Sequence, residues 1–421
     1  MQNNKKLFNS IIGYEEVKIT LKRIVDVLEN QDKYKKLGCT IPHGLFLYGP
    51  PGTGKTSIAN DIINNVNRKK FIVRKNKSDG KFIDYLNNVF KSAKSQQPSI
   101  ILLDDLDKFS DDDNRNAEEY VAVQSLIDSI KDEDIFVIAT ANDKHVLPSS
   151  LIRSGRFDVK IEIDNPDKND SYKIIEHYLK RKKIDKNVNI KNLSYILNGS
   201  SCAELESITN KAGMYAGYKN KTSIGMDELV TASLELKYDS NVEDLNKEDK
   251  YTIYTAYHEA GHALVQELLE TGSVSFVTVA RCDSNIRGYT CFVNDDNYFD
   301  DINFMINRVK SLLAGKAAIE VVYNKCDVGC NSDLHRVYDI TRRFIDNYCM
   351  EDFNSWFYNS LETSEKTKQS KDDSSNRLIT NYYNEVKGML IANRHTLDLL
   401  ANELKTKKIL FKDEIEEICN K

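Results

Sequence analysis

The stretch GLFLYGPPGTGKTSIA, residues 44–59, decides the fold of the first half of this chain. Five residues typical of a buried strand lead into a glycine-rich turn, and the turn leads into helical apolar spacing. Residues 49–56 fit G-x-x-x-x-G-K-[ST], a loop whose backbone N–H groups surround phosphate oxygens. Because strand, loop and helix stand in the order that this motif requires, a nucleotide site is favoured over a simple glycine-rich turn.

Within this loop, Lys55 is expected to reach the outer phosphates of ATP and Thr56 to ligate Mg²⁺. The full set of predicted cofactor-binding residues in the loop is Gly49, Pro50, Pro51, Gly52, Thr53, Gly54, Lys55, Thr56 and Ser57.

Short apolar runs alternate with helical patterns on both sides of this loop. After residues 44–48 they occupy residues 71–75, 99–103, 135–140 and 159–163. Continuous apolar strands separated by helices predict a parallel sheet covered on both faces, here an α/β nucleotide-binding domain over residues 1–163. Beyond residue 163 the apolar spacing becomes helical, which predicts a small helical domain over residues 164–238.

Polar side chains follow the strands of this predicted sheet. Asp104 and Asp105 end the strand IILLDD; we assign Asp104 to Mg²⁺ and Asp105 to the attacking water. The alternative, that acidic residues only solvate the strand end, is disfavoured by the neighbouring phosphate loop. Asn142, after the next strand, stands where it would polarise the water or sense the γ-phosphate.

Two arginines, Arg153 and Arg156, follow in the segment LIRSGRFD. Surface charge is one explanation, but this pair at i, i+3 suits a guanidinium donated to the γ-phosphate of a neighbouring subunit. An arginine that acts in this way implies a ring of subunits.

A second chemistry is indicated by TAYHEAGHAL, residues 255–264. On a helix, His258 and His262 lie at i, i+4 on one face, so both imidazoles reach one Zn²⁺, and Glu259 stands beside them as a general base. The alternative is an amphipathic helix carrying two solvent-exposed histidines.

A catalytic zinc needs a third protein ligand, and spacing alone leaves it open. The candidates, all in the segment that follows, are Cys326, Asp327, Cys330, Asp333, His335 and Asp339. Asn331 or Ser332 is expected to cap a helix with Asp333 in its first turn. The apolar stripe of that helix comprises Leu334, Val337, Phe344 and Ile345. Cys326 and Cys330 are interpreted as core or surface thiols.

Composition limits the classes of function. The chain has 421 residues, 40% of them hydrophobic and 29% charged, with a net charge of −5 and no sustained basic block. The chain is therefore long enough for several domains, and its charge pattern does not indicate nucleic acid as a partner. Eight scattered cysteines and the lack of a secretory pattern favour a cytoplasmic setting, with membrane association through a partner left open, and no run is long enough for a membrane span.

The residues collected above, in their order and spacing, resemble the FtsH family of ATP-dependent AAA+ zinc metalloproteases. The likeness begins with LFNSIIGYEEVK, continues through GPPGTGKT, PSIILLDDLD and IATANDKHVLPSSLIRSGRFD, and in the second half includes TAYHEAGHAL, LLAGKAAIEVVY and VGCNSDLHRVYDITRRFI.

The resemblance implies a homohexamer that uses ATP, Mg²⁺ and Zn²⁺ to unfold, thread and degrade unfolded or damaged proteins. It implies Asp333 as the third zinc ligand, Arg153 and Arg156 as arginine fingers, Asn142 as a sensor, and residues 288–292 as an edge strand that receives substrate. The expected fold class is multidomain: an α/β AAA+ domain with a helical lid (164–238), a linker (239–250) and a mainly helical peptidase domain (251–421) with a mobile loop at 362–376.

Three features depart from the family. Relatives usually begin with a transmembrane segment, whereas this chain opens almost directly on the ATPase domain, so we expect a soluble relative or an anchor supplied elsewhere. Asp105 stands where the family usually has glutamate, which predicts slower ATP hydrolysis. Ser78 and Asp79 stand where the family's pore loop has an aromatic and an aliphatic residue, with Phe82 as a substitute if the register shifts. We therefore expect the pore loop to hold substrate weakly, so that stably folded proteins are degraded poorly even if unfolded ones are cleaved.

The function predicted from the sequence is thus an ATP-dependent zinc metalloendopeptidase. The alternative is a protein-remodelling ATPase or chaperone with a weak or idle protease domain.

Overall fold

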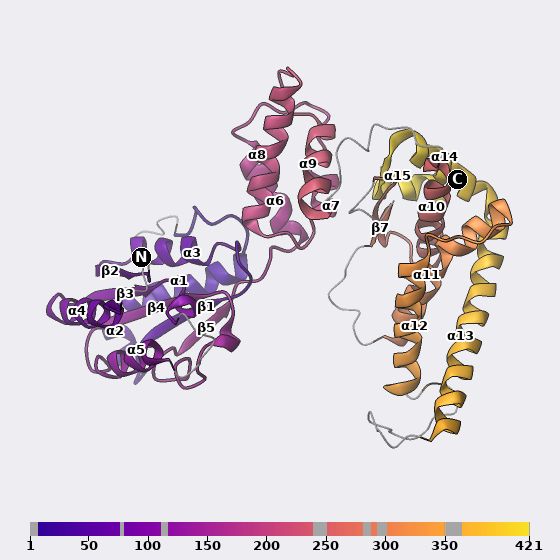
Figure 1. The fold of residues 1–421 in the computed structure, drawn as a ribbon. Helices are drawn as coiled ribbons and strands as arrows, with labels where there is room; N and C mark the ends of the chain where they lie inside the picture. Colours follow the sequence, from indigo (N-terminus) through magenta and orange to yellow (C-terminus); the bar gives the residue numbers. More distant parts are fainter. Residues whose placement is uncertain are drawn as a thin grey trace. The chain divides into compact units, whose positions relative to one another are not determined.

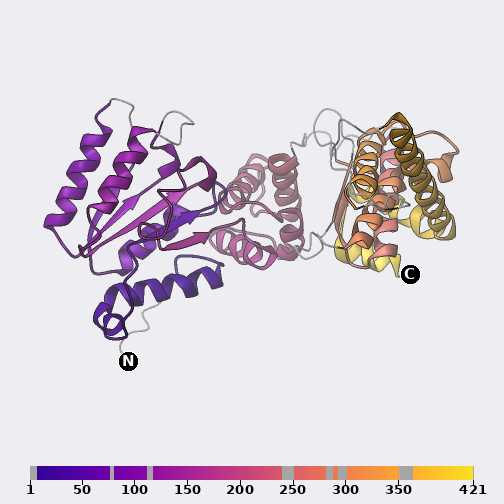
Figure 2. The same cartoon turned by 90° about the horizontal axis from the view of Figure 1, so that it is seen from below.

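The computed structural model describes residues 7–75, 80–110, 117–238, 251–280, 288–292, 301–348, 350 and 364–420. It contains two compact units, one formed by residues 1–190 and 197–226 and the other by residues 191–196 and 227–421. Figure 1 labels the elements of each unit, and Figure 2 shows them from below.

The first unit is built on a five-stranded parallel sheet in the order β2-β3-β4-β1-β5. Its strands are β1 (Gly44–Tyr48), β2 (Lys69–Val73), β3 (Ser99–Leu103), β4 (Ile135–Ala141) and β5 (Val159–Glu162). The five strands predicted from apolar runs are confirmed, with β2 beginning two residues earlier than expected. The helices of this unit are α1 (Glu15–Glu29), α2 (Gln31–Lys35), α3 (Lys55–Asn65), α4 (Phe82–Ser95), η1 (Leu106–Lys108), α5 (Glu118–Asp128), η2 (Lys144–Val146), α6 (Lys168–Leu179) and α8 (Cys202–Tyr218).

Helices cover both faces of this sheet, as Figure 2 shows. Because side chains alternate along a strand, Phe46 packs on one face with α4 and α5, while its neighbours Leu45 and Leu47 pack on the other with α1 and α3. Strands buried on both faces must be apolar throughout, which is why these segments could be read from the sequence.

The start of α8 lies directly over the phosphate loop. The Ala203 N–H donates to the Gly52 carbonyl at 3.1 Å, and a Cβ on Gly52 would stand 2.9 Å from the Ser201 hydroxyl. Ser201 and Glu204 form a capping box that fixes this end of the helix. A glycine at position 52, with its φ of +79°, therefore lets the loop turn and α8 approach.

The second unit is mainly helical around a small antiparallel sheet in the order β7-β6-β8. Its elements are α7 (Ile190–Ile196), α9 (Met226–Tyr238), α10 (Thr252–Leu269), β6 (Val274–Thr278), β7 (Tyr289–Phe292), α11 (Ile302–Tyr323), α12 (Asn331–Asp346), α13 (Glu365–Ala392), α14 (Arg394–Lys407), β8 (Ile409–Phe411) and α15 (Lys412–Cys419). Helix α10 is at the centre, packed on α11 and α14. No helix in the ranges described is both long and apolar enough to cross a membrane.

Two sequence predictions about this unit are wrong. The mobile loop expected at 362–376 is helical from Glu365 onward, because Ser364 caps α13 and Lys371 is buried in an ion pair with Asp346 at 2.6 Å. Helix α12 is capped at Cys330 without a side-chain bond, so neither Asn331 nor Ser332 is the cap, although Asp333 does lie in the first turn. The predicted linker at 239–250 lies outside the described residues, and the domain boundaries stay predictions.

Candidate metal centre and nucleotide site

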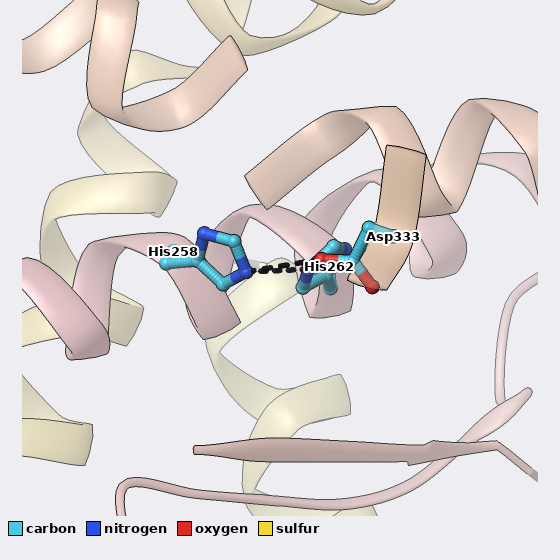
Figure 3. Close-up of side chains that lie close together, drawn as sticks. All are labelled: His258, His262 and Asp333. Carbon is cyan, nitrogen blue, oxygen red and sulfur yellow. Dashed lines mark hydrogen bonds and ion pairs between the residues drawn. The ribbon is translucent and has the colours of Figure 1, made fainter. Parts of the chain in front are cut away.

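Three side chains from two helices converge in the second unit (Figure 3). The Nε2 atoms of His258 and His262, one turn apart on α10, are 3.0 Å from each other. An oxygen of Asp333, at the start of α12, lies 3.3 Å and 3.4 Å from these two nitrogens. Within the described part of the chain this is the one such cluster of metal-binding side chains, and its ligand atoms lie within 4.8 Å of one another.

The other ring nitrogens fix the orientation of both imidazoles. Nδ1 of His262 lies 2.7 Å from the Ser311 carbonyl, which can only accept, so Nδ1 carries the proton and Nε2 keeps its lone pair. Nδ1 of His258 lies 2.6 Å from Asp327, which is held in turn by the Gly329 N–H at 2.8 Å. Both Nε2 atoms therefore point at the same place, as two nitrogen ligands of one Zn²⁺ require.

Glycines in the packed helices leave room for the centre. A Cβ on Gly315 of α11 would stand 2.5 Å from both His258 Cε1 and His262 Nε2. A Cβ on Gly261 of α10 would stand 2.7 Å from the Ala314 carbonyl. Only residues without a side chain allow α11 to approach α10 this closely.

The charges around the histidines favour a cation. Burial opposes charge on His258, but its hydrogen bonds with Asp327 and Asp333 outweigh burial and raise its pKa to about 10. Burial likewise opposes the charge of Asp333, yet the two histidines hold its pKa well below the usual range. The field that favours a proton here also favours a divalent metal ion at the same three atoms.

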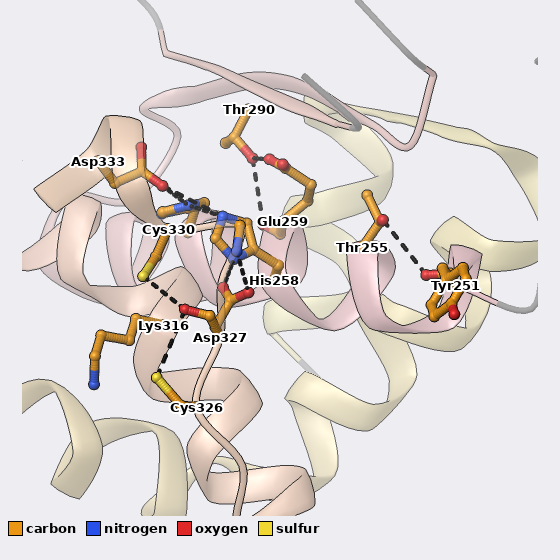
Figure 4. Close-up of polar contacts among 12 residues, drawn as sticks. Tyr251, Thr255, His258, Glu259, Thr290, Lys316, Cys326, Asp327, Cys330 and Asp333 are labelled. Atoms are coloured by element: carbon orange, nitrogen blue, oxygen red, sulfur yellow. Dashed lines mark hydrogen bonds and ion pairs between the residues drawn. The ribbon is translucent and has the colours of Figure 1, made fainter. Parts of the chain in front are cut away.

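Glu259 lies on α10 beside the cluster but points to β7 (Figure 4). The Thr290 hydroxyl donates to its Oε2 at 2.7 Å, and a Cβ on Gly288 would stand 2.6 Å from its Oε1. The carboxylate is buried, and this burial raises its pKa, while the histidines oppose the shift. A carboxylate with a raised pKa, held in one orientation, suits the transfer of a proton near neutral pH.

Asp327 gives a first test of this centre. Asp327→Asn is expected to weaken zinc binding about 10–100-fold, because the histidine it orients loses a charged hydrogen-bond acceptor. Competition with a chromophoric chelator measures the affinity, with Asp339→Asn, an exposed position on the nearby helix α12, as the matched control. Equal affinities for the two variants would contradict the role given to Asp327.

The nucleotide-binding residues gather at the carboxyl edge of the first unit's sheet. Lys55 is buried, and its Nζ donates to the carbonyls of Gly49 and Pro50 at 2.8 Å and 2.7 Å. Burial lowers its pKa, which nearby aspartates partly offset. The Thr56 hydroxyl donates to Asp104 at 2.8 Å, which places the two predicted Mg²⁺-binding residues side by side.

Neighbouring side chains hold Asp104 in place. Thr140 donates to its Oδ1 at 2.7 Å, and Arg74 donates to its Oδ2 at 2.6 Å. The next strand end carries Asn142, whose N–H donates to Asp107 at 2.9 Å.

Asp105 has a different environment from Asp104. Its backbone is left-handed, with φ 56°, its side chain is 42% exposed, and its carboxylate pairs with Lys108 at 2.8 Å. The Asp105 side chain is thus one carbon shorter than that of glutamate, and its carboxylate is already paired with Lys108 three residues along the chain.

We predict that Asp105→Glu speeds ATP hydrolysis several-fold, because the longer side chain moves the carboxylate outward by about 1.5 Å, a shift to which catalytic positioning is sensitive. Steady-state phosphate release at saturating ATP is the measurement. A rate that is unchanged or lower would contradict the prediction.

The structure separates the two predicted arginine fingers. Arg156 is 5% exposed; its Nη2 pairs with Asp128 at 2.6 Å, and its Nη1 donates to Gln124 at 3.0 Å. Arg153 is exposed. Arg156 therefore ties the end of the sheet to α5 within its own chain, and the role of Arg153 as an arginine finger stays a prediction.

This difference predicts distinct phenotypes. Arg156→Ala is expected to lower the melting temperature of the first unit by several degrees, since it removes a buried guanidinium together with its bonds to Asp128 and Gln124. Arg153→Ala is expected to leave the melting temperature unchanged and to reduce ATPase activity at least about 100-fold. Calorimetry and ATPase assays on both variants separate the roles, and equal melting temperatures would overturn the assignment.

Several contributors escaped sequence reasoning. Thr290, Arg74 and the Ser311 carbonyl carry no local pattern, and Asp327 was only one candidate among six. Their roles depend on contacts between distant segments.

The predicted pore-loop residues Ser78 and Asp79 lie outside the described residues. The prediction that Phe82 could replace them is wrong, because Phe82 is buried against Phe109 with ring centroids 4.9 Å apart.

A phosphate-binding loop on a parallel sheet, joined to a His–His–Asp centre with an adjacent glutamate, defines an ATPase coupled to a metallopeptidase. Residues 45–165 match the ATPase family associated with various cellular activities (AAA), and residues 243–418 match Peptidase family M41. The chain thus combines an AAA domain with a Peptidase family M41 domain, and the relatives it resembles are FtsH proteases.

Curated relatives agree along nearly the whole chain. The ATP-dependent zinc metalloprotease FtsH 2 of Thermoanaerobacter sp. (strain X514) is 28% identical over 98% of this chain and 82% of its own length. The enzymes named ATP-dependent zinc metalloprotease FtsH of Helicobacter pylori and Thermus thermophilus are 27% and 28% identical, each over 98% of this chain and 70% of the relative.

Proposed function

We propose that this protein is an ATP-dependent zinc endopeptidase that degrades unfolded or damaged proteins as a homohexamer. The observation that carries the proposal is the convergence of His258, His262 and Asp333 beside a buried Glu259. A purely structural zinc site has no need of a general base, and it would use all four positions around the metal for protein ligands.

The residues divide the work of peptide hydrolysis. Zn²⁺ bound by the two imidazoles and Asp333 supplies a Lewis acid that activates water. Glu259 accepts a proton and later returns it to the leaving amine, with Thr290 keeping its carboxylate in place. Asp327 and the Ser311 carbonyl contact Nδ1 of the two imidazoles and so hold both Nε2 atoms toward the metal position.

Substrate reaches this centre as an extended strand in our proposal. β7 pairs with β6 along one edge and is the last strand of the described sheet. A peptide that adds to its other edge would pass beside Glu259.

ATP binding at Lys55, Thr56 and Asp104, with Arg153 reaching a neighbouring subunit, would supply the energy for unfolding and threading the substrate. Five cysteines of the described residues, Cys39, Cys202, Cys326, Cys330 and Cys419, are free thiols, which supports a reducing, cytoplasmic setting.

The test is cleavage of a fluorescent, permanently unfolded protein with ATP, without nucleotide, and after removal of zinc by a chelator. We expect cleavage only with both ATP and zinc, in an assembly whose sedimentation fits six copies. ATP hydrolysis by an intact assembly without any cleavage would overturn the proposal in favour of a remodelling ATPase.

A further inference from the structure

Strand β7 contacts both the general base Glu259 and the cationic side chain of Arg308. Gly288 and Thr290 adjoin the Glu259 carboxylate, and the Arg308 guanidinium lies over the ring of Phe292, 4.1 Å from its centroid. Thr290 and Phe292 are two residues apart, so about 7 Å of strand separates the general base from the arginine. A peptide paired along β7 would pass first one and then the other.

Helix spacing places a second arginine beside the same centre. Arg308 lies on α11 seven residues before Gly315, which is two helical turns, or about 10 Å, from the glycine that touches both histidines. Arg336 lies three residues after Asp333 on α12, on the same helix face. The two helices pack against each other. Both arginines therefore flank the metal centre on the side where β7 ends.

These two arginines have no carboxylate partner among the described residues, whereas Lys310 and Arg342 of the same two helices each have one. Lys310 pairs with Glu385 at 2.6 Å, and Arg342 pairs with Asp346 at 2.8 Å. Burial lowers the pKa of Arg308, and the charge of Arg336 lowers it further. Two like charges brought together, one partly desolvated, cost free energy that a bound anion would recover.

We propose that Arg308 and Arg336 form a subsite that binds the carboxylate side chain of a substrate Asp or Glu, two to three residues from the scissile bond. The proposal rests on the proposed function, because it places the substrate along β7. Guanidinium groups bind carboxylates by paired, charge-assisted hydrogen bonds, and the ring of Phe292 keeps the Arg308 fork in place. The enzyme would therefore prefer cleavage sites with an acidic residue at one fixed distance.

Quenched fluorescent peptides test the subsite. Each has an amidated C-terminus and one Glu, moved along an otherwise neutral sequence, with a Gln version of each as the matched substrate. We expect one position where kcat/KM for Glu exceeds that for Gln about 10-fold or more. In Arg308→Gln this ratio falls towards one, and in Arg308→Lys it is partly kept. In the control Arg343→Gln the ratio is unchanged, because Arg343 is exposed and lies two turns beyond Arg336 on α12.

Binding measured without turnover separates the possible failures. Anisotropy of the same peptides on zinc-loaded Glu259→Gln protein is expected to show the same Glu preference, and Arg308→Gln added to that protein removes it. Cleavage of neutral peptides with no Glu preference at any position would overturn the subsite and leave the peptidase intact. No cleavage of any peptide would instead contradict the proposed function, and the binding data would then decide on the subsite. A gain seen only with a free terminal carboxylate would overturn the side-chain assignment.

Discussion

Glu259→Gln is expected to reduce peptide-bond cleavage by a factor of about 10²–10⁴ while ATP hydrolysis continues. Glutamine keeps the size of the side chain and a hydrogen bond to Thr290, which is 2.7 Å from the native carboxylate, but it cannot accept the proton from water. The loss should appear almost entirely in kcat, since neither the metal ligands nor β7 changes.

The measurement is cleavage of short peptides and of an unfolded protein by zinc-loaded protein, with zinc content determined in parallel. Glu267→Gln is the control, because Glu267 is also a buried glutamate of α10 but binds the N–H groups of Gly272 and Val274 away from the metal centre. Cleavage by the Glu259 variant within a factor of ten of the unaltered protein would rule out its role as general base.

Lys55→Met is expected to reduce ATP hydrolysis by at least about 10²-fold and to stop degradation of folded proteins. The methionine fills the buried space but carries no charge to the outer phosphates. Lys55 is held by two loop carbonyls and lies in a field of nearby aspartates, so its charge is already oriented before the nucleotide binds.

Two substrates distinguish this effect from a general loss of folding. A short peptide that needs no unfolding should still be cleaved by the Lys55 variant, whereas a folded, tagged protein should not. Lys69→Met, at an exposed position of β2, is the matched control and should behave as the unaltered protein. Folded protein degraded at the normal rate without ATP hydrolysis would mean that the two chemistries are not coupled.

The strands and the site residues with local motifs were predictable from the sequence for a physical reason. A strand buried on both faces must be apolar along its whole length, and a phosphate loop or an H-E-x-x-H helix places its functional atoms by local geometry alone. Leu45 to Leu47 and the pair His258 and His262 are of this kind.

Features that depend on contacts between distant segments could not be predicted in this way. β8 has three residues and exists because β6 offers it an edge. The start of α13 looks like a mobile polar segment, yet Lys371 is buried there because Asp346 of another helix neutralises it. Arg156 fits a motif for a role between subunits, and its partners Asp128 and Gln124 are only apparent once the chain is folded.

The three metal-binding side chains come from two different helices, and this affects the stability of the protein when zinc is scarce. His258 and His262 belong to α10, whereas Asp333 lies in the first turn of α12, so one bound ion cross-links the two helices. By thermodynamic linkage, zinc at about a thousand times its dissociation constant adds about 4 kcal/mol to the stability of the peptidase fold. A cell short of zinc would then hold a peptidase unit that is less stable as well as inactive, whereas the ATPase unit, which does not bind that ion, would keep its stability.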